Sequence, residues 1–321
     1  MKPLMLVLDD WEGKIAESSA WNKISESVHI KYITKPLEEM SEEELKDVIF
    51  LMAIRERTPL TAKNFDLLPN LKLVLQTGGH AYHIDQEAAS ERGIKIALGR
   101  RAKAPILSVP ELTVAIMLSL VHLIPQAQVE MKSGGWPKLL GRTLSNRRLG
   151  ILGLGRHGSK VAEIAKSAFQ MDVVSWERPT NSPSTNQNFP RLPLEELLKT
   201  SDIISVHLRL SPESTGLLSA ETFQLFKEGS ILINTSRGAI LDETALVHCL
   251  QNGPIAAAGL DVFEKEPLDK NSPLRRLDNV LLTPHIGWTV EEVFEEFAQI
   301  AATQVAQYLD GNLPSSELIS S

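Results

Sequence analysis

Three stretches in the second half of the sequence each end an apolar run with a polar residue suited to chemistry. They are ILINTSRG, which carries Arg237, GLDVFEKEP, which carries Glu264 and Glu266, and LLTPHIG, which carries His285. An arginine can hold a carboxylate through paired hydrogen bonds, and an imidazole beside a carboxylate can exchange a proton near neutral pH. Together these side chains could bind a 2-keto acid, polarise its carbonyl group and protonate it without a metal ion.

Each of these residues also has a purely structural interpretation. Arg237 could form an ion pair with Asp242, and His285 could hydrogen-bond within its own loop. Glu266 could be a surface charge in a turn. The catalytic interpretation therefore depends on the elements that carry the three residues. Polar residues at the C-terminal ends of parallel strands face the crevice where open α/β sheets bind their ligands.

Short apolar runs alternate with helical patterns in two consecutive series. The sequence predicts five strands between Pro3 and Gly99, and six more between Arg148 and His285. Strands that alternate with helices indicate βαβ units and a parallel sheet. The apolar segment at 111–124 predicts a buried linking helix, because a helix that spans a membrane needs about 20 such residues. An amphipathic helix is predicted near the end of the chain.

The composition is that of ordinary globular domains, and a length of 321 residues makes two domains the first expectation. The net charge of -7 and the scattered basic residues give no reason to expect nucleic acid as a partner. The apolar run LMLVL near the start is too short for the core of a signal peptide. With Cys249 as the single cysteine, no internal disulfide or CxxC metal site can form. We therefore expect a cytoplasmic protein that has no membrane partner.

The segment GLGRHG has the spacing of a dinucleotide-binding turn, and it lies between a predicted strand and a predicted helix. Gly153 permits a tight turn, Gly155 lets the backbone approach a pyrophosphate, and Gly158 lets the helix pack closely on the strand. Arg156 and His157 lie within this turn, where they either contact the pyrophosphate or are exposed at the helix start. The sequence therefore predicts a dinucleotide cofactor.

An acidic residue, Glu177, follows the turn at about the separation expected for a carboxylate that binds the ribose hydroxyls of NAD. Its neighbour Arg178 is either a solvated loop charge or a residue that could neutralise the 2′-phosphate of NADP. Since a carboxylate repels that phosphate, the sequence favours NAD over NADP.

The glycine turn and the motifs NTSRG, GLDVFEKEP and TPHIGW, in this order and spacing, resemble the D-isomer-specific 2-hydroxyacid dehydrogenase family. This family includes phosphoglycerate, glyoxylate/hydroxypyruvate and D-lactate dehydrogenases. The resemblance covers nearly the whole chain, and it implies Arg237 as the residue that binds and polarises the substrate and His285 as the acid/base. It selects Glu266 over Glu264 as the partner of His285, because the family's glutamate directly precedes a proline.

The resemblance also implies contacts with the ligands. The expected additional cofactor contacts are Thr113, His207, Leu208, Thr235 and Asp261. The loop TGGH is expected to bind the substrate carboxylate through backbone N–H groups, and its candidate residues are Gly78, Gly79 and His80. His83 stands where family members often have asparagine, so the identity of the 2-hydroxy acid stays open. The role of Trp288 in TPHIGW, as a pocket wall or as packing, is open as well.

The architecture implied by the resemblance is an α/β fold of two doubly wound parallel-sheet domains. A Rossmann-type cofactor domain is inserted into a flavodoxin-like substrate domain. Residues 1–102 and 287–321 would form the discontinuous substrate-binding domain, and residues 103–286 the NAD-binding domain, which includes the linking helix. Family members are usually homodimers that pair through their cofactor domains, and we expect the same of this chain.

Two other functions are compatible with these motifs. An NAD(H)-sensing binding protein without catalytic activity could keep the same residues on the same fold. A formate or phosphite dehydrogenase would share the cofactor turn, although formate enzymes have glutamine at the position of Glu266. The sequence favours an NAD-dependent oxidoreductase that interconverts a 2-keto acid and a D-2-hydroxy acid, with no metal in its site.

Overall fold

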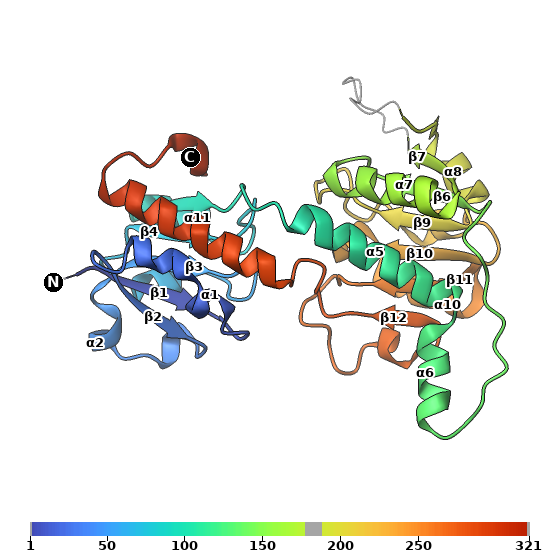
Figure 1. The fold of residues 1–321 in the computed structure, drawn as a ribbon, viewed down its shortest axis with the longest axis horizontal. Helices are drawn as coiled ribbons and strands as arrows, with labels where there is room; N and C mark the ends of the chain where they lie inside the picture. The colour runs from blue at the N-terminus through green and yellow to red at the C-terminus, as the bar shows by residue number, and fades with distance from the viewer. Residues whose placement is uncertain (1, 177–187, 320–321) are drawn as a thin grey trace. The chain divides into compact units, whose positions relative to one another are not determined.

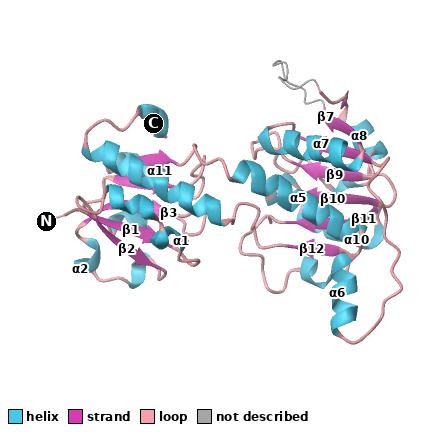
Figure 2. Cartoon of the chain, viewed as in Figure 1, coloured by secondary structure: helices cyan, strands magenta, loops and turns pink. Residues whose placement is uncertain are grey.

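The computed structural model describes residues 2–176 and 188–319 (Figure 1). The chain forms two compact units. Unit 1 consists of Met1–Ala104 and Val290–Ser321, and unit 2 consists of Pro105–Thr289. Each unit contains its own parallel sheet with helices on both faces (Figure 2).

Unit 1 has a five-stranded sheet in its described part, with the order β2-β1-β3-β4-β5. The strands are β1 (Leu4–Leu8), β2 (His29–Ile33), β3 (Val48–Ala53), β4 (Leu73–Gln76) and β5 (Lys95–Leu98). All of the pairings are parallel, and this order is that of flavodoxin-like sheets. The sequence predicted these five strands, because each is a short apolar run between helical or turn segments.

Helices cover both faces of the unit 1 sheet, and the longest of them comes from the end of the chain. The helices are α1 (Lys14–Glu17), α2 (Glu42–Leu45), α3 (Ala62–Asp66), α4 (Gln86–Glu91) and α11 (Glu291–Leu309). Helix α11 lies across the sheet, and the rings of Phe50 on β3 and Tyr308 on α11 meet edge to face with centroids 5.6 Å apart. The strands therefore bury side chains on both faces, as in other doubly wound sheets.

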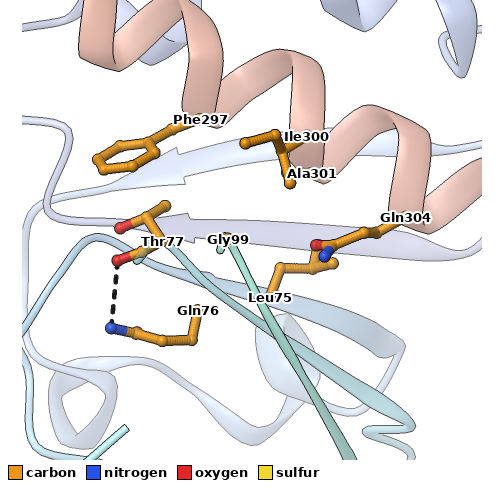
Figure 3. Close-up of a pocket in the computed structure, with 8 residues that line it drawn as sticks. All are labelled: Leu75, Gln76, Thr77, Gly99, Phe297, Ile300, Ala301 and Gln304. Carbon is orange, nitrogen blue, oxygen red and sulfur yellow. Dashed lines mark hydrogen bonds between the residues drawn. The ribbon is translucent and has the colours of Figure 1, made fainter. Parts of the chain in front are cut away.

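A small cavity lies between α11 and the ends of β4 and β5 (Figure 3). Its volume is about 10 Å³. It is lined by Leu75, Gln76, Thr77, Gly99, Phe297, Ile300, Ala301 and Gln304. Because this volume corresponds to about one water molecule, the cavity is a packing gap and no site for a 2-keto acid.

Within the residues that the structure describes, unit 2 has a seven-stranded parallel sheet with the order β12-β11-β10-β9-β6-β7-β8. The strands are β6 (Arg148–Leu152), β7 (Asp172–Trp176), β8 (Arg191–Leu192), β9 (Ile203–Val206), β10 (Ser230–Asn234), β11 (Ile255–Leu260) and β12 (Val280–Leu282). The order from β8 to β11 is that of the Rossmann fold, and β12 extends it. The two sheets together confirm the predicted fold class.

The sequence predicted six strands for this half of the chain, and β8 is the one that it missed. This strand has only two residues and lies between Pro190 and Pro193. Such a stretch is too short to show the alternation of apolar and polar residues that indicates a strand. A proline at each side further masks it, because proline lacks the N–H that a sheet requires.

The helices of unit 2 lie on both faces of its sheet. They are α5 (Pro105–Val121), α6 (Ile124–Lys132), α7 (Arg156–Phe169), α8 (Leu194–Thr200), α9 (Ala220–Phe223) and α10 (Glu243–Asn252). Side chains of β6 alternate between two cores: Leu149 and Ile151 pack with residues of α5 and α7, and Leu152 packs with residues of α8 and α10. This alternation fixes the register of the central strand, because a shift by one residue would exchange the two faces.

The predicted linking helix at 111–124 is shorter at its C-terminus than expected. Helix α5 ends at Val121, and α6 begins at Ile124 after two intervening residues, of which Leu123 adopts a positive φ of 56°. The axes of α5 and α6 differ in direction by 65°. Among the described residues, no single helix is long and apolar enough to cross a membrane, and only this bent pair reaches the required length and composition.

Candidate active site

The glycine turn connects β6 to α7 and leaves open space above its backbone. Gly153 has a φ of +105°, and a Cβ on Gly158 would lie 2.0 Å from the carbonyl oxygen of Gly153, so neither position accepts a side chain without a backbone shift. A Cβ on Gly155 would meet nothing within 4 Å. The turn therefore packs tightly where helix meets strand and is open at Gly155. It fits a pyrophosphate group, which the positive end of the helix dipole at the start of α7 would attract.

The predicted adenosine-side residues, His207 and Leu208, lie beside this turn at the end of β9. A Cβ built on Gly153 would be 2.8 Å from the carbonyl oxygen of His207 and 3.0 Å from Cδ2 of Leu208. The Nε2 atom of His207 forms a 2.9 Å hydrogen bond with Ser205 Oγ. Burial, together with the charge of His157, lowers the pKa of His207 to about 3. His207 is therefore a neutral imidazole at physiological pH.

The end of β10 is tied to α5 by two threonines. Thr113 is fully buried, and its hydroxyl donates to the carbonyl oxygen of Val109 at 2.8 Å. Since that bond uses its only proton, the hydroxyl of Thr235 is the donor in the 2.8 Å hydrogen bond between the two threonines. Both residues were predicted as cofactor contacts, and the structure brings them together at the C-terminal end of the sheet.

Arg237 is held by the buried Asn234 at the end of β10. The side-chain amide of Asn234 donates to the carbonyl oxygen of Arg237 at 2.9 Å, and its Oδ1 atom accepts from the N–H of Ser236 at 3.0 Å. A Cβ on the next residue, Gly238, would lie 1.8 Å from the carbonyl carbon of Phe263. This absence of a side chain lets the backbone beside Arg237 pack against the segment that carries Glu266.

His285 and Glu266 form the closest acid–base pair of the site. The Nδ1 atom of His285 lies 2.6 Å from Oε2 of Glu266, whose Oε1 atom accepts from the N–H of Phe263 at 2.9 Å. The alternative glutamate, Glu264, is exposed, and its N–H donates to a carboxylate oxygen of Glu243. The structure therefore places Glu266, and not Glu264, against the imidazole.

Asp261 holds the loop that carries His285. One of its carboxylate oxygens accepts from the hydroxyl of Thr283 at 2.6 Å and from the N–H of Ile286 at 2.8 Å. The other accepts from the N–H of Gly287 at 2.9 Å. Burial raises the pKa of Asp261, although these three hydrogen bonds favour its charged form. Sequence reasoning assigned Asp261 to the cofactor and missed this anchoring role, for which the strand-end position gave no signal.

The predicted substrate loop belongs to unit 1 and follows β4. Gly78 is buried and has a φ of +121°, whereas Gly79 is exposed and would accept a Cβ without a contact. His80 stacks on Tyr82, with ring centroids 4.6 Å apart. Trp288, whose role the sequence left open, is buried, with 7% of its surface exposed.

Two predicted cofactor residues, Glu177 and Arg178, lie outside the described residues. The glycine turn contributes two more predicted cofactor residues at the start of α7: Arg156 is exposed and His157 is half-buried. In the part of the chain that the structure describes, no group of three or more histidine, cysteine, aspartate or glutamate side chains is placed to hold a metal ion.

Comparison with known proteins identifies the family. Residues 114–287 match the model of the NAD binding domain of D-isomer specific 2-hydroxyacid dehydrogenases. A D-3-phosphoglycerate dehydrogenase from Methanocaldococcus jannaschii is 36% identical over 275 residues, which cover 84% of this chain and 52% of that protein. A hydroxypyruvate reductase from Thermotoga maritima is 36% identical over 264 residues, 79% of this chain and 84% of the relative. Several relatives, such as the first, are thus about twice as long as the matched region.

A solved structure extends the similarity to the whole fold. The D-lactate dehydrogenase from Aquifex aeolicus, solved with NAD and lactic acid, superimposes with a TM-score of 0.81 at 27% sequence identity. The match covers 98% of each chain. This chain therefore belongs to the D-isomer specific 2-hydroxyacid dehydrogenase family, and its residues 114–287 form that family's NAD binding domain.

Proposed function

We propose that this protein is an NAD-dependent D-2-hydroxyacid dehydrogenase that interconverts a 2-keto acid and a D-2-hydroxy acid. The observation that carries the proposal is the 2.6 Å contact between His285 and Glu266. His285 follows β12, Glu266 follows β11 and Arg237 follows β10. These three strands are adjacent in the sheet. An imidazole–carboxylate pair and a guanidinium thus lie at one edge of the sheet in unit 2, where parallel α/β folds perform their chemistry.

In the proposed reduction, His285 supplies the proton and Arg237 holds the substrate. Because Nδ1 of His285 is bound to Glu266, Nε2 is the nitrogen left to donate a proton to the carbonyl oxygen of the 2-keto acid. Glu266 orients the ring and stabilises the imidazolium before the transfer. The guanidinium of Arg237 binds the carboxylate of the substrate and polarises its carbonyl group.

The glycine turn of unit 2 fits the cofactor. Gly153, Gly155 and Gly158 would hold the pyrophosphate at the start of α7, and His207 and Leu208 would line the adenosine side. When bound, the cofactor would supply the hydride as NADH in the reduction and would accept it as NAD⁺ in the reverse oxidation. Thr113, Thr235 and Asp261 are proposed to position the nicotinamide end. Glu177 supports NAD over NADP through its position in the sequence.

The remaining assignments follow the same family pattern. We propose unit 1 as the substrate-binding domain, with the N–H groups of Gly78, Gly79 and His80 binding the substrate carboxylate. The single cysteine, Cys249, and the composition support a cytoplasmic location.

The test is a measurement of NADH and NADPH oxidation with glyoxylate, hydroxypyruvate, pyruvate, phenylpyruvate and phosphohydroxypyruvate. We expect NADH oxidation with at least one of these acids and formation of the D-hydroxy acid, with a smaller kcat/KM for NADPH. Tight NADH binding without oxidation by any acid would favour the NAD(H)-sensing alternative. NAD reduction by formate or phosphite would favour a formate or phosphite dehydrogenase instead.

A second copy of the chain is the partner that we propose for unit 2. Large apolar side chains are exposed along α6 and the segment after it, among them Val129, Met131, Trp136 and Leu140, and Trp136 and Leu140 are 84% and 92% exposed. Figure 1 shows that α6 and this segment extend away from the unit 2 sheet. Exposed apolar surface on such an extension is typical of an interface.

The double variant Trp136→Glu/Leu140→Glu is therefore expected to be a monomer, because it places two charges in the proposed interface. Light scattering after size-exclusion chromatography measures the mass. Leu309→Glu, which changes an exposed leucine of unit 1, is the matched control and should stay dimeric. A monomeric unmodified protein would contradict the proposal.

A further inference from the structure

A group of charged and aromatic side chains in unit 1 is not used by the proposed mechanism. It lies on the loops that follow β1, β3 and β4, which are neighbours in the sheet, so the loops share its C-terminal edge with Gly78. We call this group the unit 1 loop cluster, and its members are Glu12, Arg55, Glu56, Arg57, His80 and Tyr82.

Arg55 is fixed directly beside the substrate loop. A Cβ on Gly78 would lie 2.5 Å from Nη1 of Arg55, and the N–H of Arg55 donates to Thr77 Oγ1 at 2.7 Å. The buried side chain of Gln76 donates to the carbonyl oxygens of both Arg55 and Thr77 at 3.3 Å, and Figure 3 shows the bond to Thr77. The two loops are therefore joined, and the charge of Arg55 is placed next to Gly78.

The second arginine, Arg57, is engaged by a carboxylate on the neighbouring loop. Its guanidinium forms two hydrogen bonds with Glu12, at 2.8 and 2.6 Å, and a third with the carbonyl oxygen of Asp9 at 2.6 Å. Burial alone would raise the pKa of Glu12, but the hydrogen bonds and the charge of Arg57 outweigh it and lower this pKa. Glu12 is thus ionised at neutral pH and balances the charge of Arg57.

Glu56 balances the charge of Arg55 as Glu12 balances that of Arg57, and its carboxylate also contacts His80. One carboxylate oxygen of Glu56 is 3.4 Å from Nε of Arg55, and the other is 3.1 Å from Nε2 of His80. His80 in turn stacks on the exposed ring of Tyr82, with an angle of 18° between the ring planes. The negative charge of Glu56 therefore lies between Arg55, which is beside Gly78, and His80, which follows Gly79.

We propose that Glu56 is a specificity-determining residue that makes the enzyme select 2-keto acids with a single anionic group and disfavour those that carry a second one, such as a phosphate. This inference rests on the function proposed above, in which the Gly78–His80 loop binds the substrate carboxylate. A carboxylate bound there lies next to His80, whose Nε2 atom is 3.1 Å from Glu56, so the rest of a small keto acid is placed near this negative charge. Like charges at such distances repel strongly where little water separates them, and a phosphate carries nearly two charges at neutral pH.

The rings of His80 and Tyr82 lie beside Glu56 and can contact the neutral end of a singly charged substrate. They form a stacked surface that can contact a neutral substituent, such as a hydroxymethyl, methyl or benzyl group, without burying an unpaired charge. Arginine side chains are common phosphate ligands, so Arg55 and Arg57 could serve a phosphorylated substrate if their charges were not balanced. The carboxylates that face both arginines favour the unphosphorylated class, although relatives include a D-3-phosphoglycerate dehydrogenase.

The experiment compares two matched pairs of acids that differ by one anionic group. These are hydroxypyruvate with phosphohydroxypyruvate, and pyruvate with oxaloacetate. The unmodified enzyme should have the higher kcat/KM for the singly charged member of each pair. In Glu56→Gln, which keeps the size and hydrogen-bonding oxygen of the side chain, this preference should fall by about tenfold or more, because the repulsion is removed.

Glu43→Gln is the matched control, because Glu43 is exposed in the same unit and pairs with Lys46 instead. It should keep the preference of the unmodified enzyme. An equal change in Glu43→Gln and Glu56→Gln, or no change in either, would overturn the proposal. So would a preference of the unmodified enzyme for the doubly anionic acids.

A second measurement has one arm that uses only the unmodified enzyme and so does not depend on the folding of a variant. Inorganic phosphate should not compete with the 2-keto acid in the unmodified enzyme at millimolar concentrations, and it should compete in Glu56→Gln. Competitive inhibition of the unmodified enzyme by phosphate would overturn the inference while the proposed function stands. If none of the acids supports NADH oxidation, the proposed function itself fails, and the inference fails with it.

Discussion

His285→Ala is expected to lower kcat by about 10²–10⁴-fold, the usual contribution of a general acid or base. The variant removes the group that donates the proton to the carbonyl oxygen, but it leaves the glycine turn and Arg237 in place. The affinity for NADH, measured by fluorescence titration, should therefore stay within about threefold of the unmodified value. Steady-state kinetics with the best 2-keto acid from the substrate series measure kcat.

Two further variants make this result specific to the His285–Glu266 pair. His248→Ala is the matched control, because His248 is an exposed histidine on α10 in the same unit, and it should keep full activity. Glu266→Gln keeps an acceptor for Nδ1 but removes the charge, so its kcat should fall less than that of His285→Ala. Unchanged activity in His285→Ala would exclude the proposed mechanism.

The fold could be predicted from the sequence because its strands and helices are local patterns. The buried strands of a parallel sheet are short, nearly continuous apolar runs, and turn residues separate them from helical segments. The failures were also local. Strand β8 was too short to form a pattern, and the break at Leu123 depends on one positive φ that the apolar run 111–124 does not reveal.

The members of the candidate site could be predicted as a set, but the contacts that hold them could not. Arg237, Glu266 and His285 stand in recognisable motifs at strand ends. The bonds from Asp261 to the N–H groups of Ile286 and Gly287 join two different strands, and no spacing rule predicts them. Such long-range contacts follow from the packed fold and from the need to pair buried polar groups.

The cluster beside Gly78 shows the same limit in unit 1. In the sequence, Glu56 is an acidic residue between two arginines, which is typical of a solvated loop. The contact between Glu56 and His80 appears only when β3 and β4 pair and place their following loops together. The sequence therefore selected the Gly78–His80 loop as a candidate for anion binding, whereas the charge balance around it required the structure.

Gly158→Ala is expected to weaken NADH binding by at least about 100-fold and to lower the melting temperature. Its Cβ would lie 2.0 Å from the carbonyl oxygen of Gly153, so the backbone of the turn must move. Overpacking of this kind costs about 1–3 kcal/mol of the free energy of unfolding. The same movement displaces the N–H groups at the start of α7 that are proposed to bind the pyrophosphate. Fluorescence titration and thermal unfolding measure the two effects.

Gly155→Ala separates cofactor binding from stability. Gly155 has a φ of -77°, which alanine adopts readily, and its Cβ would meet no protein atom within 4 Å. The melting temperature should therefore stay within about 2 °C, whereas NADH affinity should fall because the methyl group enters the space over which a pyrophosphate approaches. Ser167→Ala, on the exposed side of α7, should change neither quantity. If Gly155→Ala binds NADH normally, the open space above this glycine is not the cofactor site, and the pyrophosphate position proposed at the start of α7 is wrong.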